Sequence, residues 1–161
     1  GAQYTAYLAG ELSRNTANAV DICGSAVFAE DEVFYLDGYE TQLCNLLSGE
    51  MKRISLVLDG RAAAIQLKCA PRLSVRLPES PEEPPVIRVR AAVRCDEADA
   101  GKYVEALRQD VASLLIECQQ WGADPVGFCE RARMRVWTLM DWEALDWPEL
   151  YRKAVFEIDI R

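Results

Sequence analysis

Arginine side chains that alternate with apolar residues are the part of this sequence best suited to chemistry. Two stretches, 72–77 and 86–95, show this alternation, which predicts β-strands. Because alternate side chains of a strand point to one face, pairing of these strands would place up to five arginines on one face of a sheet. The arginines concerned are Arg72, Arg76, Arg88, Arg90 and Arg94. Such a face could contact an anion, either lipid headgroups or an acidic patch on a partner protein.

The end of the chain offers a second explanation for these arginines. Residues 154–161 also alternate, and Glu157 and Asp159 fall on the polar side of the stretch. Opposite charges on neighbouring strands would form ion pairs on a solvated face, each worth about 0.2–1 kcal/mol. We predict that the arginines mainly balance these two carboxylates, so that single Arg→Gln changes shift stability only slightly.

Catalytic chemistry has little support in the sequence. The chain contains no histidine, which is the commonest general base and a common metal ligand. Carboxylates are close in sequence at Asp141/Glu143 and Glu82/Glu83, but a retaining glycosidase needs two carboxyls about 5 Å apart in a cleft, and nothing places either pair in one. A Gly-x-Ser-x-Gly elbow and a Walker loop are both absent. We therefore predict a protein that is not an enzyme and needs no cofactor or metal.

The six cysteines allow disulfide bonds in principle, because their number is even. They are Cys23, Cys44, Cys69, Cys95, Cys118 and Cys129. No Cys-x-x-Cys pair occurs, and the spacing is scattered. Cys95 and Cys118 fall on predicted apolar faces, where free thiols behave as small hydrophobic side chains. We predict reduced cysteines rather than bridges or a zinc site.

Composition narrows the class of protein. A chain of 161 residues has the length of one ordinary domain, and its apolar fraction of 50% argues against disorder. We expect a single domain over residues 1–161. The net charge of −8 argues against nucleic-acid binding. No run of 18 apolar residues is present, so no membrane-spanning segment is expected.

Strand signals dominate the first two thirds of the chain, where hydrophobic period and turn residues mark the elements. The first part of the chain is predicted to form a helix over 3–15, a strand over 22–28 covered on both faces, and a return strand over 33–36. A short helix over 39–47, ended by Gly49, should follow. After it we predict strands over 54–58 and 62–77, joined by Asp59-Gly60, and a strand over 86–95. Pro71 should interrupt or bulge its strand. Residues 78–85 hold four prolines and three glutamates at Glu79, Glu82 and Glu83, which predicts an exposed acidic loop.

A long amphipathic helix begins near Gly101. Its predicted apolar stripe is Val104, Leu107, Val111, Leu114, Leu115 and Cys118. Gly122 suits the left-handed residue that ends a helix, and Asp124 before Pro125 suits the start of a second helix running towards Trp137.

Trp121 should pack at the end of the stripe, whereas Trp142 and Trp147 lie among acidic residues and could contact a partner. The fold class is therefore α+β: a mainly antiparallel sheet packed against one long helix and two or three shorter ones.

Several short motifs occur in a recognisable order along the chain. They are Gly24-Ser25-Ala26-Val27-Phe28, Leu36-Asp37-Gly38-Tyr39-Glu40-Thr41, Gly122-Ala123-Asp124, Gly127-Phe128, Trp142 and the alternating strand Val155–Arg161. Together they resemble the C-terminal domain of the Ger(x)C family, the C subunits of receptors with which bacterial spores sense nutrients and germinate. Cys129 stands where that family often has a second glycine. The resemblance covers most of the chain.

The resemblance implies a longer parent protein with a lipoprotein signal, a lipidated cysteine and further N-terminal domains. It also implies a place at the outer face of the spore's inner membrane, beside membrane-spanning A and B subunits. The function it implies is assembly within a receptor, with Gly122, Asp124, Gly127 and Phe128 as a structural corner. The alternative is a domain that binds a small nutrient molecule directly, which would need a buried pocket with convergent polar groups.

Overall fold

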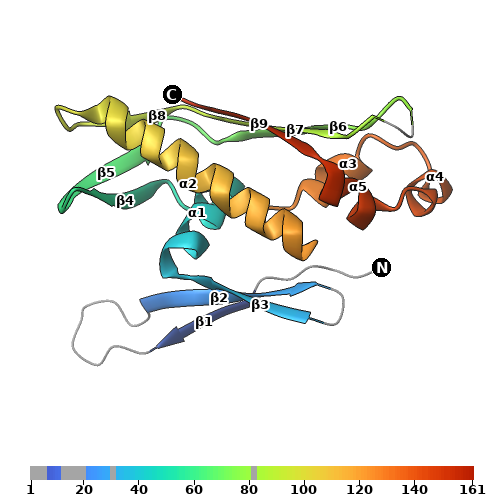
Figure 1. Ribbon diagram of the computed structural model, residues 1–161, viewed down its shortest axis with the longest axis horizontal. Helices are drawn as coiled ribbons and strands as arrows, with labels where there is room; N and C mark the ends of the chain where they lie inside the picture. The colour runs from blue at the N-terminus through green and yellow to red at the C-terminus, as the bar shows by residue number, and fades with distance from the viewer. Residues whose placement is uncertain (1–6, 12–20, 30–31, 81–82) are drawn as a thin grey trace.

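The computed structural model describes residues 7–11, 21–29, 32–80 and 83–161, with side chains from residue 24 onward. The elements, shown in Figure 1, are β1 (Tyr7–Glu11), β2 (Asp21–Ala29), β3 (Glu32–Asp37), α1 (Gly38–Ser48), β4 (Arg53–Leu58), β5 (Arg61–Leu67), β6 (Arg72–Arg76), β7 (Val86–Ala91), β8 (Val93–Cys95), α2 (Ala100–Trp121), α3 (Phe128–Arg133), α4 (Leu139–Ala144), α5 (Trp147–Lys153) and β9 (Val155–Ile160).

Within the described ranges, the strands form three sheets of three strands each, in the orders β1-β2-β3, β4-β5-β8 and β6-β7-β9. All pairs are antiparallel except β7 with β9, which run in parallel. The predicted α+β class with a mainly antiparallel sheet is therefore confirmed.

The sheets β4-β5-β8 and β6-β7-β9 are joined, because β6 follows β5 along the chain and β8 follows β7. β5 pairs with β8 and the next strand, β6, pairs with β7, so both strand runs break at the same level of the sheet. Across the break, the Lys68 N–H donates to the Ala92 carbonyl oxygen at 2.8 Å. Pro71 lies in the break, where its missing N–H is tolerated. The predicted interruption at Pro71 is confirmed.

The long helix α2 packs against the strands of both joined sheets and against α5. Its buried residues are Tyr103, Leu107, Val111, Leu114, Leu115 and Cys118. This is the predicted stripe with one change, because Tyr103 rather than Val104 is buried at its start. The Tyr103 hydroxyl donates to the Arg61 carbonyl oxygen at 3.2 Å, which ties the helix to the β4–β5 hairpin.

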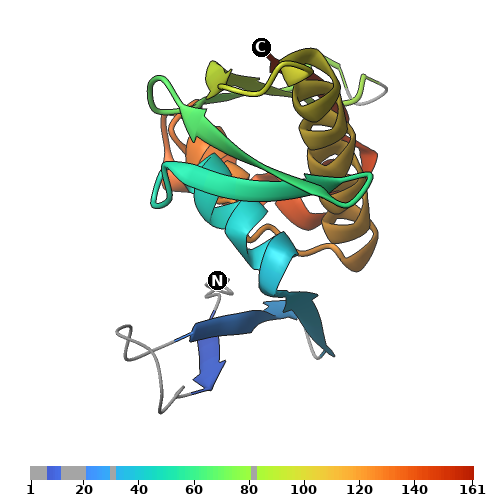
Figure 2. The same cartoon turned by 90° about the vertical axis from the view of Figure 1, so that its left-hand side faces the viewer.

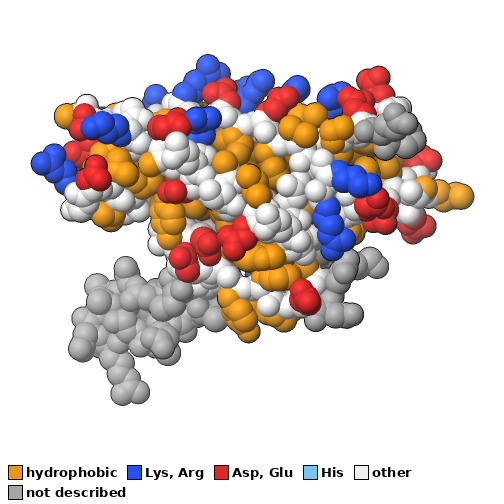
Figure 3. Space-filling view, in the orientation of Figure 1, with side chains coloured by type: hydrophobic (Ala, Val, Ile, Leu, Met, Phe, Trp, Pro, Cys, Tyr) orange, Lys and Arg blue, Asp and Glu red, His pale blue; other side chains and the backbone are white. Residues whose placement is uncertain are grey.

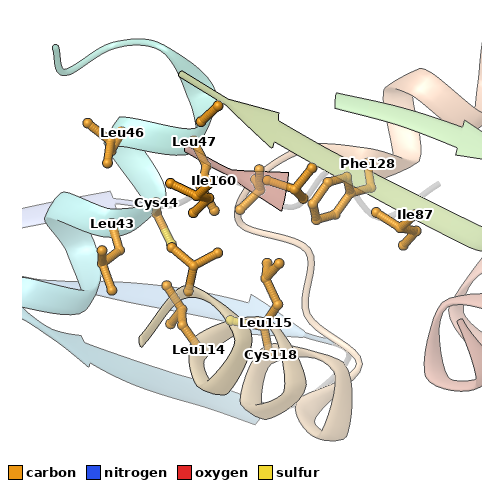
Figure 4. Close-up of a cluster of buried hydrophobic side chains, with 14 of the residues drawn as sticks. Leu43, Cys44, Leu46, Leu47, Ile87, Leu114, Leu115, Cys118, Phe128 and Ile160 are labelled. Carbon is orange, nitrogen blue, oxygen red and sulfur yellow. The ribbon is translucent and has the colours of Figure 1, made fainter. Parts of the chain in front are cut away.

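Helix α1 packs against β2, β3 and β4. It begins with a capping box, in which the Asp37 side chain accepts from the Glu40 N–H and the Glu40 side chain accepts from the Asp37 N–H. It ends at Gly49, as predicted. Figure 4 shows side chains of α1 and α2 directed towards one another, with Ile160 and Phe128 close by. The core is thus closed by side chains from both halves of the chain.

The N-terminal sheet forms a separate layer beside α1, as Figure 2 shows. Val27 and Leu36 are buried on the side of this sheet that faces the core. On the same side, the Phe34 ring stacks on Trp121 with centroids 4.7 Å apart. Trp121 therefore packs as predicted, and it joins the end of α2 to β3.

Three predicted elements near the ends of the fold are wrong in part. Residues 7–11 form strand β1 rather than a helix, and the rest of the predicted helix over 3–15 lies outside the described residues. The strand over 22–28 is not covered on both faces, because Phe28 is 43% exposed while Val27 is buried. The second helix does not begin at Pro125 or reach Trp137. The short helix α3 forms within that range, and α4 and α5 follow after Trp137.

Candidate interaction surfaces

The corner after α2 is built by two hydrogen bonds that close the helix. Gly122 adopts φ 68°, ψ 18°, a left-handed conformation that glycine accepts without strain. The Gly122 N–H donates to the Gln119 carbonyl at 3.0 Å, and the Ala123 N–H donates to the Cys118 carbonyl at 2.9 Å. This pair of bonds is the Schellman motif. The predicted helix end at Gly122 is confirmed.

Asp124 holds the next turn, but it does so differently from the prediction. Its side chain is buried, and its two carboxylate oxygens accept from the Gly127 N–H at 2.9 Å and the Cys129 N–H at 2.6 Å. The residue that precedes α3 is Gly127, with φ 81°, and the side chain of Phe128 is fully buried behind it. Asp124 therefore satisfies the start of α3 from three residues further back, because Pro125 and Val126 form a turn and not a helix.

Burial raises the pKa of Asp124 above its usual value, and the backbone N–H groups of residues 127–129 together with Arg131 oppose that rise. A carboxylate kept in the interior by backbone donors is a structural feature of this kind of corner. Within the described residues, no group of three or more His, Cys, Asp or Glu side chains could hold a metal ion. The corner thus positions α3 and the segments after it.

Aromatic side chains carry α5 and support α4. Phe128 lies 6.4 Å from Tyr151 and 6.1 Å from Phe156, between ring centroids. Trp147 is in contact with Tyr151 at 5.9 Å and with Trp142 at 6.2 Å. Trp147 is buried and Trp142 is half-buried. The interpretation that Trp142 and Trp147 could both contact a partner is wrong for Trp147, because its side chain is buried.

The exposed tryptophan is instead Trp137, which sequence reasoning placed on a helix. Its side chain is 98% exposed and lies beside other exposed apolar residues on the segment from α3 to α4. We call this surface the apolar tip; its members are Met134, Trp137, Leu139 and Met140. Figure 3 shows hydrophobic side chains protruding at the end of the molecule where α4 lies in Figure 1.

The sequence contains a signal that could have placed the residues of the tip in a loop. The Thr138 hydroxyl accepts from the Asp141 N–H at 3.1 Å, which is the start of a new helix. A threonine followed three residues later by an acidic residue marks such a start, so residues 134–137 could have been assigned to a loop.

The arginines predicted to share one face divide between two sheets. Arg72, Arg76, Arg88 and Arg90 lie on β6 and β7, whereas Arg94 lies on β8. Arg94 is paired with Asp96 through an Nε–Oδ1 distance of 2.7 Å. The expected face of up to five arginines therefore holds four, because the break at Ala92 sends the rest of the strand into the other sheet.

Ion pairs account for two of these four arginines. Arg88 lies opposite Glu157 on β9, and its Nε donates to that carboxylate. Arg76 donates to Glu83 at 2.9 Å. The pKa values of Glu157 and Glu83 are lowered, the first by the hydrogen bond from Arg88 and the second by the Glu79 N–H and then by Arg76. Figure 3 shows acidic and basic side chains interspersed along this side of the molecule.

Arg72 and Arg90 are not paired in this way. They lie directly opposite each other in the β6–β7 register. The ion pairs found in the described residues include neither of them, and Asp159 opposite Arg90 on β9 pairs with Arg161 at 3.3 Å. The predicted ion pair with the last strand is formed by Arg88, whereas Arg90 lies opposite Asp159 and, with Arg76, also helps to lower the pKa of Glu157.

Two surface hollows lie towards the C-terminal end of β6. The larger has a volume of about 700 Å³ and lies between the proline-rich loop and α5. Most of its lining side chains are exposed, including the acidic Glu79, Asp146 and Glu149. A smaller hollow of about 350 Å³ includes Arg76, Arg88 and Arg135 in its lining.

The described cysteine side chains are free thiols: Cys44, Cys69, Cys95, Cys118 and Cys129. Burial raises the pKa of Cys44 to about 12 and raises that of Cys118 as well. The side chain of Cys23 lies outside the described residues. Cys44 and Cys118 thus sit in the core as neutral hydrophobic groups, as expected for Cys118.

These features define an α+β domain whose prominent surface features are an apolar tip and a basic sheet face. No helix in the described part of the chain is long and apolar enough to cross a bilayer. Comparison with protein-family models gives no match, and comparison with curated proteins gives none.

Comparison with solved structures finds the same fold in the crystal structure of the GerBC protein, with a TM-score of 0.66. The sequences are 17% identical, and the match covers 98% of this chain and 55% of that one. This chain therefore spans about half the length of GerBC. The Ger(x)C-like fold implied by the sequence motifs is confirmed.

Proposed function

We propose that this domain is a non-enzymatic assembly domain of a protein similar to the C subunit of a spore germinant receptor. The observation that carries the proposal is the apolar tip, in which Trp137 is 98% exposed and Met140 is 80% exposed. Clusters of large exposed apolar side chains can mark sites of contact with other molecules. Tryptophan is also enriched among residues that dominate binding energy at protein interfaces.

Residues on both sides of the apolar tip are packed into the core. Trp142, on α4, packs on Trp147, which is buried against Tyr151. The corner at Asp124 fixes the start of α3 on the other side of the tip. Both flanks of the tip are therefore anchored to the core, which would reduce the entropy lost on binding.

Charges of both signs surround the tip, which suits a protein partner. Asp141 and Glu143 are exposed on α4 next to Met140, and Arg133 and Arg135 are exposed on either side of Met134. Carboxylates at this position would be repelled by anionic headgroups and would be costly to bury in a bilayer. An apolar groove with a basic rim on a protein fits both the tip and these carboxylates.

The partners proposed from the family resemblance are the membrane-spanning A and B subunits of the receptor. In this proposal the parent protein is held by a lipid anchor at the outer face of the spore's inner membrane. This domain would then contribute to nutrient-triggered germination by joining the complex and not by making or breaking bonds. The 17% identity to GerBC leaves this function a proposal that the shared fold supports.

Direct binding of a nutrient is the competing function, and the 700 Å³ hollow beside α5 is where it would occur. The side chains there are largely exposed, and Glu79, Glu83, Asp146 and Glu149 make it acidic. Small-molecule sites usually bury most of their ligand, and a hollow with so exposed a lining would leave much of a ligand in contact with water. Assembly through the tip is therefore the better supported function.

A pull-down of the domain with detergent-solubilised A and B subunits tests the proposal. We expect the wild-type domain to be retained and the Trp137→Ala/Met140→Ala variant to bind at least about tenfold more weakly, as for residues at an interface centre. Tyr35→Ala is the matched control, because Tyr35 is also exposed, at 77%, but lies on β3. Retention of the double variant at the wild-type level, or failure of the wild type to bind either subunit, would refute the assembly function.

A further inference from the structure

We propose that Arg76, Arg88 and Arg135 form a binding site for a phosphate group. We call this site the arginine hollow; it has a volume of about 350 Å³ and also includes the Ser74 side of β6. It lies beside the apolar tip, because Arg135 directly follows Met134 in the chain, but the inference does not depend on the proposed function.

Three different segments bring these arginines together. Ser74 on β6 lies directly opposite Arg88 on β7, and Arg76 lies opposite Val86. Arg76 and Arg88 are therefore diagonal neighbours on one face, within reach of long side chains. Arg135 follows α3, which packs along β6, and it joins the same hollow from outside the sheet.

The charges around the hollow are not balanced by the described residues. Glu83 and Glu157 each pair with one arginine, Arg76 and Arg88, but Arg135 forms none of the ion pairs found there. Next to the hollow, Arg72 and Arg90 face each other directly across the two strands.

Like charges opposite one another destabilise a sheet, and this arrangement occurs in a chain of net charge −8. That pair lies outside the hollow, and Asp159 lies opposite Arg90 on β9, so Arg135 is the arginine of the hollow that a bound anion would neutralise.

Phosphate suits this arrangement because of guanidinium geometry. Arginine presents five N–H donors in a planar fork that matches the oxygens of a phosphate group. The ion pairs at the rim use Nη1 of Arg76 and Nε of Arg88, so other donors on both side chains remain for a ligand. The Ser74 hydroxyl adds a neutral donor. The ligand could be a free phosphate or phosphomonoester, or the headgroup of an anionic phospholipid.

Nuclear magnetic resonance can test the site with inorganic phosphate as the probe. Side-chain Nε–H signals of arginine should shift and saturate at millimolar phosphate in the wild-type protein, and chloride at equal ionic strength should not reproduce the shifts. Arg135→Gln should weaken phosphate binding by at least about fivefold, a loss comparable to removing one charge-assisted hydrogen bond. Arg133→Gln is the matched control, because Arg133 is exposed on α3 but does not line the hollow.

A second experiment identifies the source of the phosphate. Vesicles of phosphatidylglycerol and of phosphatidylcholine are sedimented with the wild type, Arg135→Gln and Arg133→Gln. Sedimentation with phosphatidylglycerol vesicles but not with phosphatidylcholine vesicles, lost in Arg135→Gln, supports a lipid headgroup as the ligand. Saturable phosphate binding without sedimentation supports a soluble phosphate ligand. The site is refuted if phosphate causes no saturable shifts, if chloride is equivalent, if Arg135→Gln binds phosphate as the wild type does, or if vesicles bind without phosphate binding.

Discussion

Replacing Asp124 by alanine is the sharpest test of how the corner holds the rest of the domain. The change removes both acceptors of the Gly127 and Cys129 N–H groups, which are bonded at 2.9 and 2.6 Å. An unsatisfied buried donor costs about 1–3 kcal/mol. Part of this loss is offset, because the variant no longer pays the desolvation cost of burying the Asp124 carboxylate. We therefore expect Asp124→Ala to lower the free energy of unfolding by about 2–4 kcal/mol.

Urea unfolding measures this loss, and thermal unfolding should show a fall in Tm of roughly 5–15 °C for a chain of this size. Asp146→Ala is the matched control. Asp146 is exposed and accepts one N–H, from Glu149 at 3.2 Å, so its loss should cost only about 0.5–1 kcal/mol. Equal losses for the two variants would refute the reasoning, because burial of the Asp124 carboxylate would then have no energetic consequence.

The same pair of proteins also tests the pKa of Asp124. Burial raises the folded-state pKa of this carboxyl above its unfolded value of about 3.9. Its contribution to stability is then fully present below the unfolded pKa and is lost as pH rises through the folded pKa. The stability gap between the wild type and Asp124→Ala should accordingly narrow from acidic to neutral pH. A gap that widens instead would show that the backbone donors outweigh burial.

Two other predictions concern the core thiols and the end of α2. Iodoacetamide should modify the exposed Cys69 in the native protein, whereas Cys44 and Cys118 should react only on unfolding, because burial keeps both thiols protonated; mass spectrometry reports the labels, and a disulfide between any two described cysteines would contradict it. Gly122→Ala should destabilise by about 1 kcal/mol, because its φ is 68° and a Cβ would lie 2.7 Å from the Arg152 side chain. Gly101→Ala, on the same helix with open space around it, should instead be neutral or stabilising by about 0.5 kcal/mol, and equal effects in urea unfolding would argue against a strained Gly122.

Tertiary structure decided which tryptophans are exposed and which arginines lie together. Trp137 and Trp147 are each followed within four residues by an acidic side chain, yet one is 98% exposed and the other 4% exposed. The difference arises because α5 packs under the sheet and the segment before α4 does not. Arg135 joined the arginine hollow only through the packing of α3 beside β6, which no local pattern reports.

The sequence by itself determined the features that depend on neighbours along the chain. Alternation in residues 86–91 and 155–160 assigned each side chain to a face, and the spacing in α2 assigned its buried stripe. Gly122 marked the end of α2 because few other residues accept its backbone conformation. These signals are local because covalent geometry sets the periods of two and 3.6 residues.

Only the tertiary structure decided which strands meet, and in what register. The parallel pairing of β7 with β9 places Glu157 opposite Arg88, and the break at Ala92 sends Arg94 into another sheet. Asp124 could be recognised as a capping residue, but its burial and its bonds to Gly127 and Cys129 required the turn at Pro125. Pairing, burial and turn geometry at these positions depend on the packing of segments far apart in sequence, and no pattern along the chain encodes that sum of contacts residue by residue.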